Sequence, residues 1–104
     1  MILSTLFAAS LLLTPPQYVP STAVVDQAMK ITATVMICEP VLPAHIVQKW
    51  LRLASRLGVS QSDVVAIQDL VRRKGLTATE TVCQETITVQ FQELDALLPA
   101  HEGH

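Results

Sequence analysis

The residues best suited to chemistry in this 104-residue chain are its two cysteines, Cys38 and Cys83. A small domain in an oxidising compartment usually pairs two cysteines in a disulfide, whereas in the cytosol they stay reduced. The two lie 45 positions apart, and closing a loop of that size stabilises a fold by up to about 4 kcal/mol in the chain-entropy model. We therefore predict one structural disulfide, with two buried free thiols as the alternative.

A second group of chemically competent residues contains the three histidines. His101, Glu102 and His104 at the carboxyl end could bind Zn²⁺ or Cu²⁺ together with His45, since imidazole and carboxylate groups suit both metals. A polar chain end has no neighbouring groups to orient such ligands, so we expect no metal site there.

Patterns typical of catalysis or cofactor binding are missing from the sequence. With the cysteines paired, the remaining nucleophiles are scattered serines and threonines without an adjacent base and orienting group. The chain has no Gly-rich phosphate loop and no CxxC motif. We therefore expect a protein that is not an enzyme, uses no cofactor and takes no small-molecule substrate.

Four stretches of helical periodicity must position the two cysteines. In each stretch, apolar residues recur at steps of three and four, as on one face of an α helix. The predicted helices cover 24–38, 43–57, 60–75 and 77–98. Their apolar stripes are Val24, Ala28, Ile31, Val35 and Cys38; Ile46, Trp50, Leu53 and Leu57; Val64, Ile67 and Val71; and Cys83, Ile87, Phe91, Leu94 and Leu98.

Specific residues mark the ends of these helices. Proline stops a helix, glycine past its last turn favours a left-handed cap, and a hydroxyl residue followed three positions later by an acid favours a start. The predicted signals are Pro40, Gly58, Ser60 with Asp63, Gly75, and a capping box of Thr77 with Glu80.

Short connections between helices favour antiparallel packing in up-down-up-down order, which indicates an all-α, four-helix antiparallel bundle. That order places the end of the first helix beside the start of the fourth, where Cys38 and Cys83 lie. The alternative is a small α+β domain, because 31–35 and 87–91 also alternate with period two and are rich in β-branched residues.

Segment 50–69, WLRLASRLGVSQSDVVAIQD, resembles a helix-turn-helix. Ala54, Gly58 and Val64 fall where that motif has its small packing residue, its turn glycine and its second-helix core residue. The likeness implies base contacts by Gln61, Ser62 and Ala66, and phosphate contacts by Arg72, Arg73 and Lys74. Any two antiparallel helices joined by a tight turn need the same residue types, whatever their function.

Charge is unevenly distributed along the chain. Residues 49–74 carry six cations and two carboxylates, a net charge of +4, although the whole chain has a net charge of −2. A basic segment in an acidic chain favours nucleic-acid binding. The exposed face of the would-be recognition helix has no cation before Arg72, however, and Asp63 and Asp69 would repel phosphate. DNA binding therefore stays the alternative function.

The first 25 residues contain no charged side chain. Apolar residues 2–13 would span about 18 Å as a helix, too short for the ~30 Å hydrocarbon core of a membrane. A Pro-rich stretch and the small residues Ser21-Thr22-Ala23 follow, a pattern typical of a secretory signal peptide cleaved after Ala23. Since no Lys or Arg precedes the apolar stretch, the alternative is a buried N-terminal helix of a cytosolic protein.

These observations together predict the organisation and the class of function. We expect a signal peptide at 1–23, a helical domain at 24–98 and a flexible tail at 99–104, with no stable membrane span after cleavage. The mature chain should be periplasmic or secreted and should bind another protein. Accessory factor of an envelope or transfer apparatus, envelope-acting toxin or inhibitor, and holdase chaperone all fit this class. The alternative is a cytoplasmic helix-turn-helix regulator that binds nucleic acid.

Overall fold

The computed structural model describes residues 19–99 and contains four α helices in that range, with no β-strand there. The helices are α2 (Thr22–Cys38), α3 (Ala44–Arg56), α4 (Gln61–Lys74) and α5 (Glu80–Leu97), and a 3₁₀ helix, η1, covers Glu39–Val41. The predicted all-α fold is confirmed and the α+β alternative is wrong. Segment 31–35 lies within α2 and segment 87–91 within α5, because the helical periodicity extends well beyond either alternating segment.

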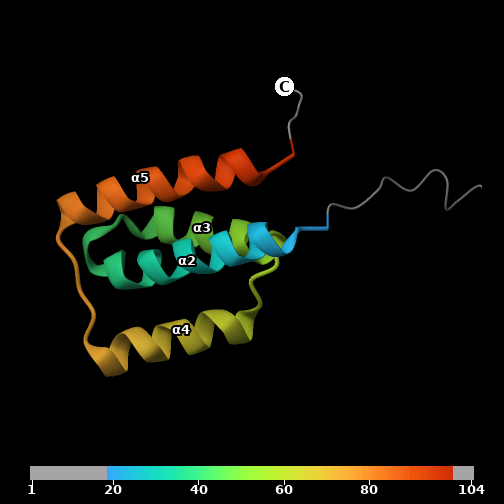
Figure 1. Cartoon of the computed structure of the whole chain (residues 1–104). Coiled ribbons are helices and arrows are strands. Elements are labelled where there is room, and N and C mark those ends of the chain that lie inside the picture. Colours follow the sequence, from blue (N-terminus) through green and yellow to red (C-terminus); the bar gives the residue numbers. More distant parts are fainter. Residues whose placement is uncertain (1–18, 100–104) are drawn as a thin grey trace, which may run out of the picture.

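The central helix of the bundle is α2, and α3, α4 and α5 each pack against it. Helices α2 and α4 run in one direction while α3 and α5 run in the opposite one, which is the predicted up-down-up-down order (Figure 1). The arrangement departs from a square bundle, because α4 packs mainly on α2 and little on α3 or α5. Helix α2 can be surrounded in this way because Asp26 and Lys30 are its only charged residues.

The predicted apolar stripe of α2 forms the centre of the core. Each of its members is at most 1% exposed: Val24, Ala28, Ile31, Val35 and Cys38. Trp50 of α3 lies against this stripe and is also buried. Its indole Nε1 donates a hydrogen bond to Thr32 Oγ1 at 3.0 Å, and Thr32 Oγ1 donates to the Ala28 carbonyl oxygen at 2.8 Å. Because an unpaired buried polar group costs about 1–3 kcal/mol, these two bonds allow both side chains to lie in the core.

The turn between α3 and α4 has the glycine conformation and the helix cap that the sequence predicts. Gly58 has a φ of 98°, a left-handed conformation that favours glycine, and a Cβ there would lie 2.8 Å from Val25 Cγ2 on α2. Ser60 and Asp63 form the predicted capping box, in which Asp63 N donates to Ser60 Oγ at 3.0 Å and Ser60 N donates to Asp63 Oδ2 at 2.9 Å. The hydrogen bond from the Ser60 backbone, together with that from its side chain, holds the pKa of Asp63 below its ordinary value.

The predicted capping box at the start of the fourth helix is wrong. Helix α5 begins at Glu80 and its N-cap is Thr79, whose hydroxyl accepts a hydrogen bond from Val82 N at 3.3 Å, rather than Thr77. The chain must cross from α4, on one side of α2, to α5 on the other (Figure 1). Residues 75–79 make this crossing, so Thr77 is used in the connection and cannot start the helix.

Two predicted core positions are also wrong. Leu53 is 41% exposed and Phe91 is 37% exposed. The apolar arc of α3 is broader than one stripe, and packing on α2 buries the side that includes Val47 and Ala54. Leu53 is left at the edge of that arc, on the side where α5 carries Phe91.

Candidate interaction surface

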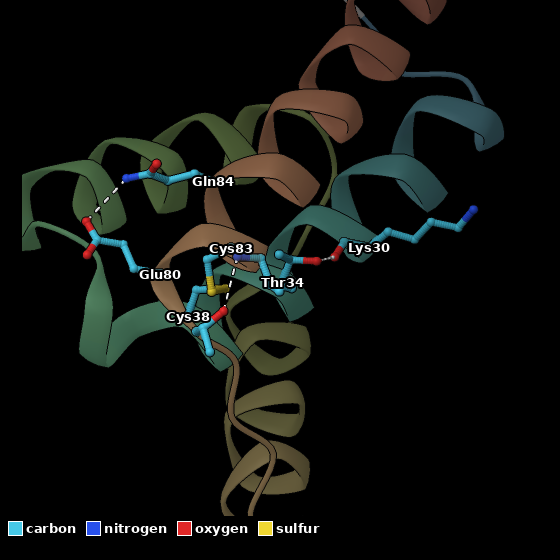
Figure 2. The surroundings of a disulfide bond; sticks show 8 residues. Lys30, Thr34, Cys38, Glu80, Cys83 and Gln84 are labelled. Atoms are coloured by element: carbon cyan, nitrogen blue, oxygen red, sulfur yellow. Dashed lines mark hydrogen bonds between the residues drawn. A yellow bond between two sulfur atoms is a disulfide. The ribbon is translucent and has the colours of Figure 1, made fainter.

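The predicted disulfide joins the end of α2 to the first turn of α5 (Figure 2). The Cα atoms of Cys38 and Cys83 lie 5.9 Å apart, and both residues are at most 1% exposed. Burial keeps both sulfur atoms away from solvent, as in a structural link between two helices. The loop that it closes contains η1, α3 and α4, so it constrains most of the bundle.

Thr34 and Gln84, two polar side chains drawn near the disulfide, are hydrogen-bonded within their own helices (Figure 2). Thr34 Oγ1 donates a hydrogen bond to the Lys30 carbonyl oxygen at 3.2 Å. Gln84 Nε2 donates to Glu80 Oε2, also at 3.2 Å.

An apolar groove of about 450 Å³ opens between α3 and α5. The rings of Trp50 and Phe91 form its aromatic part, with ring centres 5.5 Å apart and planes inclined at 52°. Leu53 and Ile46 continue the apolar surface along α3. We call this the α3/α5 groove, lined by Ile46, Lys49, Trp50, Arg52, Leu53, Arg56 and Phe91.

The hydrogen bond of the Trp50 indole to Thr32 fixes the aromatic part of the groove from below. Helix α5 is linked to α2 as well, because Gln27 Nε2 donates to the Gln90 carbonyl oxygen at 3.0 Å and to Glu93 Oε1 at 3.2 Å. Both walls are therefore held on the central helix by polar contacts as well as by packing. A surface fixed in this way loses little conformational freedom when it binds a partner.

The wall supplied by α3 is basic. Lys49, Arg52 and Arg56 line the groove, and α3 contains no Asp or Glu. Within residues 19–99, none of the three makes an ion pair. These cations therefore stand exposed around an apolar surface, with no ion-pair partner in the part of the chain that the structure describes.

Helix α5 contributes Phe91 alone to the lining of the groove, although the helix as a whole is acidic. This helix carries four carboxylates and no Lys or Arg. The carboxylates are Glu80, Glu85, Glu93 and Asp95. The α3/α5 groove therefore lies between two helices of opposite charge.

The residues implied in DNA binding lie on α4. Gln61 and Ser62 are exposed in its first turn, and Ser62 Oγ lies 3.1 Å from the capping hydroxyl of Ser60. The predicted phosphate-binding residues are in its last turn, about 16 Å further along the helix at 1.5 Å per residue. They are Arg72, Arg73 and Lys74.

Two features of α4 have structural explanations. Asp69 accepts from Arg73 Nε at 2.7 Å and from an Arg72 guanidinium nitrogen at 3.3 Å, and cations in a last turn are favoured by the helix dipole. Helices α3 and α4 each pack on α2 rather than chiefly on one another. A helix-turn-helix relies on direct packing of its two helices, so this geometry does not favour the motif.

Of the four residues considered as metal ligands, the structure describes one. His45 is exposed in the first turn of α3, whereas His101, Glu102 and His104 lie outside the described residues. Within 19–99, no three His, Cys, Asp or Glu side chains are grouped so that they could hold a metal ion.

The predicted cleavage site lies in the first turn of α2. Ser21 is the N-cap of that helix and its Oγ accepts a hydrogen bond from Val24 N at 3.2 Å, so the bond after Ala23 is helical in the folded chain. Cleavage there requires this turn to be unwound, as it is in a chain exported before folding. The apolar stretch 2–13 lies outside the described residues, and none of the helices within 19–99 is both long enough and apolar enough to span a membrane.

Sequence reasoning missed the groove as a site. Its signal was present, because Leu53 and Ile46 lie beside three cations with no nearby acid on the same helix. The contribution of Phe91 could not be seen, since it depends on how α5 is rotated against α3. Comparison with known proteins adds no function: the chain matches no protein-family model, no curated protein and no solved structure.

Proposed function

We propose that the protein is a small exported interaction protein that works by binding protein at the α3/α5 groove and has no catalytic activity of its own. The single observation that carries the proposal is the groove itself, an aromatic and aliphatic surface bordered by three cations with no ion-pair partner in residues 19–99. Aromatic residues and arginine are enriched where proteins bind each other, and in this groove Phe91 is the exposed aromatic residue while Trp50 is buried behind it.

The disulfide supports the exported half of this proposal. A buried bond between Cys38 and Cys83 forms and persists in an oxidising compartment such as the periplasm or the extracellular space. Accessory factor of an envelope or transfer apparatus, envelope-acting toxin or inhibitor, and holdase chaperone all remain within the proposed class. Identification of the protein bound at the groove separates them.

Export is tested by the mass of the protein purified under native conditions. We expect a chain that lacks residues 1–23 and that has lost two hydrogen atoms to the disulfide. An intact and fully reduced chain would contradict export. In that case salt-dependent binding to duplex DNA becomes the next measurement, because counterion release makes such binding sensitive to salt.

Binding at the groove is tested by photocrosslinking in living cells. A photoreactive phenylalanine analogue replaces Leu53, which lies in the groove, and in a control strain it replaces Val65 on α4. The two sites are comparably accessible, at 41% and 53% exposed. We expect a protein adduct from position 53 and none from position 65. Equal adducts, or none at either site, would remove the groove from the proposal.

A further inference from the structure

We propose that the segment bound at the α3/α5 groove is an acidic amphipathic helix of another protein. This inference rests on the proposed function, because it names the chemistry of the partner at the same surface. The observation behind it is that the lining of the groove combines an apolar surface with three cations and contains no carboxylate.

The three cations form a single row beside the apolar residues of α3. Lys49, Arg52 and Arg56 are spaced three and four positions apart, so they share one side of the helix, and all three are exposed. The row covers two turns, or about 10 Å at 1.5 Å per residue. Ile46 and Leu53 lie seven positions apart on the adjacent side. An apolar row and a basic row therefore run in parallel along the groove.

The carboxylates of α5 do not neutralise this basic row. Helix α5 contributes only Phe91 to the lining of the groove. Glu93, two positions later, turns to α2, where its Oε1 accepts a hydrogen bond from Gln27 Nε2 at 3.2 Å. Asp95 lies outside the lining and, within residues 19–99, forms no ion pair with any of the three cations. A partner that supplies carboxylates therefore meets charges that the described part of the fold does not pair.

The shape of the groove favours a helix as its occupant. Helices α3 and α5 run in the same direction (Figure 1), and each packs on α2 rather than chiefly on the other. The lining residues of α3 extend from Ile46 to Arg56, about 15 Å at 1.5 Å per residue. Such a groove accepts the apolar face of an amphipathic helix. Residues 19–99 contain no β-strand, so an extended peptide has no sheet edge to join there.

An anionic membrane would attract the same cations but fits this surface less well. The four carboxylates of α5 repel anionic headgroups. The indole N–H of Trp50 donates to Thr32 in the core, so it cannot reach headgroups as a tryptophan at a membrane interface does. A helix covers the groove alone, where no carboxylate lines the surface.

The proposal is tested with the purified, oxidised chain and a synthetic helical peptide of about 18 residues, or five turns. The peptide carries leucines at steps of three and four, glutamates beside them, and no aromatic residue. Trp50 is the only tryptophan of the chain and lines the groove, so its fluorescence reports binding there. We expect a saturable change in this fluorescence, with binding that weakens as salt is raised.

Reversing the charges of both partners gives the decisive result. A variant with both Arg52→Glu and Arg56→Glu should bind the acidic peptide about tenfold or more weakly than the wild type does. The same variant should bind a second peptide, in which lysine replaces every glutamate, whereas the wild type should not. Loss of folding cannot produce this exchange of preference.

The matched control reverses two exposed charges on α4. A variant with both Arg72→Glu and Arg73→Glu changes the net charge by the same amount and should bind the acidic peptide as the wild type does. Circular dichroism checks that the helices of each variant are intact.

Several outcomes with these components would overturn the acidic helix. They are no binding of the acidic peptide at millimolar concentration in low salt, equal binding of the two peptides by the wild type, or equal weakening by the α4 control. Binding to phosphatidylglycerol vesicles without binding to the acidic peptide would assign the groove to a membrane instead.

The photocrosslinked adduct at Leu53 separates this inference from the proposed function. Digestion and mass spectrometry identify the segment of the partner that is joined to position 53. We expect a segment of net negative charge with apolar residues at helical spacing. A neutral or basic segment would overturn the inference and leave the proposed function in place. If position 53 yields no adduct, both fail.

Discussion

Helices α3 and α4 carry the same number of Lys and Arg side chains, three each, but use them differently. On α4 they are gathered in the last turn, where the helix dipole favours cations, and two of them bond Asp69. On α3 they are spread along one side, beside an apolar groove, with no carboxylate on the same helix.

The position of these cations therefore matters more than their number. The α4 cluster stabilises its own helix and needs no partner to explain it. The α3 cluster has no such local explanation, since only Arg56 lies in a last turn. We infer from this difference that the binding surface is on α3 and not on α4, although the sequence likeness to a helix-turn-helix pointed to α4.

The largest loss of stability should come from removing the disulfide, because it ties α5, which carries Phe91 of the groove, to α2. Replacing both Cys38 and Cys83 by alanine should lower the free energy of unfolding by up to about 4 kcal/mol. Urea denaturation measures this, and the reduced wild-type chain should behave like the double variant. A loss below about 1 kcal/mol would show that packing alone holds α5 in place.

The next largest loss of stability should come from replacing the glycines that follow α3 and α4. Gly58 after α3 and Gly75 after α4 both have left-handed φ values, of 98° and 62°, but only Gly58 packs against another residue. Gly75→Ala should cost about 1 kcal/mol from the left-handed backbone. Gly58→Ala should cost about 2–4 kcal/mol, because its Cβ also meets Val25.

Thermal or urea denaturation of the two glycine variants provides the measurement. Equal losses of stability would mean that the turn after α3 can move away from α2. The α3/α5 groove would then be less rigid than the structure indicates.

A smaller contribution to stability comes from Asp63 at the start of α4, and it depends on pH. Hydrogen bonds from Ser60 lower the pKa of Asp63, so the folded chain favours the ionised carboxylate. This contribution is present above the ordinary pKa of 3.8 and is lost as the pH falls through the lower pKa of the folded state. The stability gap between the wild type and Asp63→Asn should therefore be constant near neutral pH and shrink below about pH 4. A gap that does not change down to pH 2 would contradict this account.

The smallest effect should come from Asp69→Asn, which releases the cations of α4. Its ion pairs are exposed, so the loss of stability should be under about 1 kcal/mol and should vanish in high salt. The released arginines should not acquire salt-dependent binding to duplex DNA, because the predicted base-contacting residues Gln61 and Ser62 lie about 16 Å away at the other end of α4. DNA binding by this variant would mean that the number of unpaired cations, and not their position, decides what the protein binds. The distinction drawn between α3 and α4 would then be wrong.

The sequence by itself determined the local structure of this protein. Apolar periodicity defined the four helices, and short-range chemistry placed Ser60, Asp63 and Gly75 at helix ends, because capping depends only on residues a few positions apart. The pairing of Cys38 with Cys83 also followed, since helix order alone brings their ends together. The start of α5 was missed because the length of its connection depends on where α4 lies.

Only the tertiary structure decided which side of each apolar arc is buried. Helix α3 has more apolar residues than its contact with α2 can cover. The rotation of α3 about its own axis buries Val47 and Ala54 against α2 and leaves Leu53 exposed. The rotation of α5 placed Phe91 beside Trp50 in the same way. A groove between two helices depends on both rotations at once. That is why its residues were visible in the sequence while the groove was not.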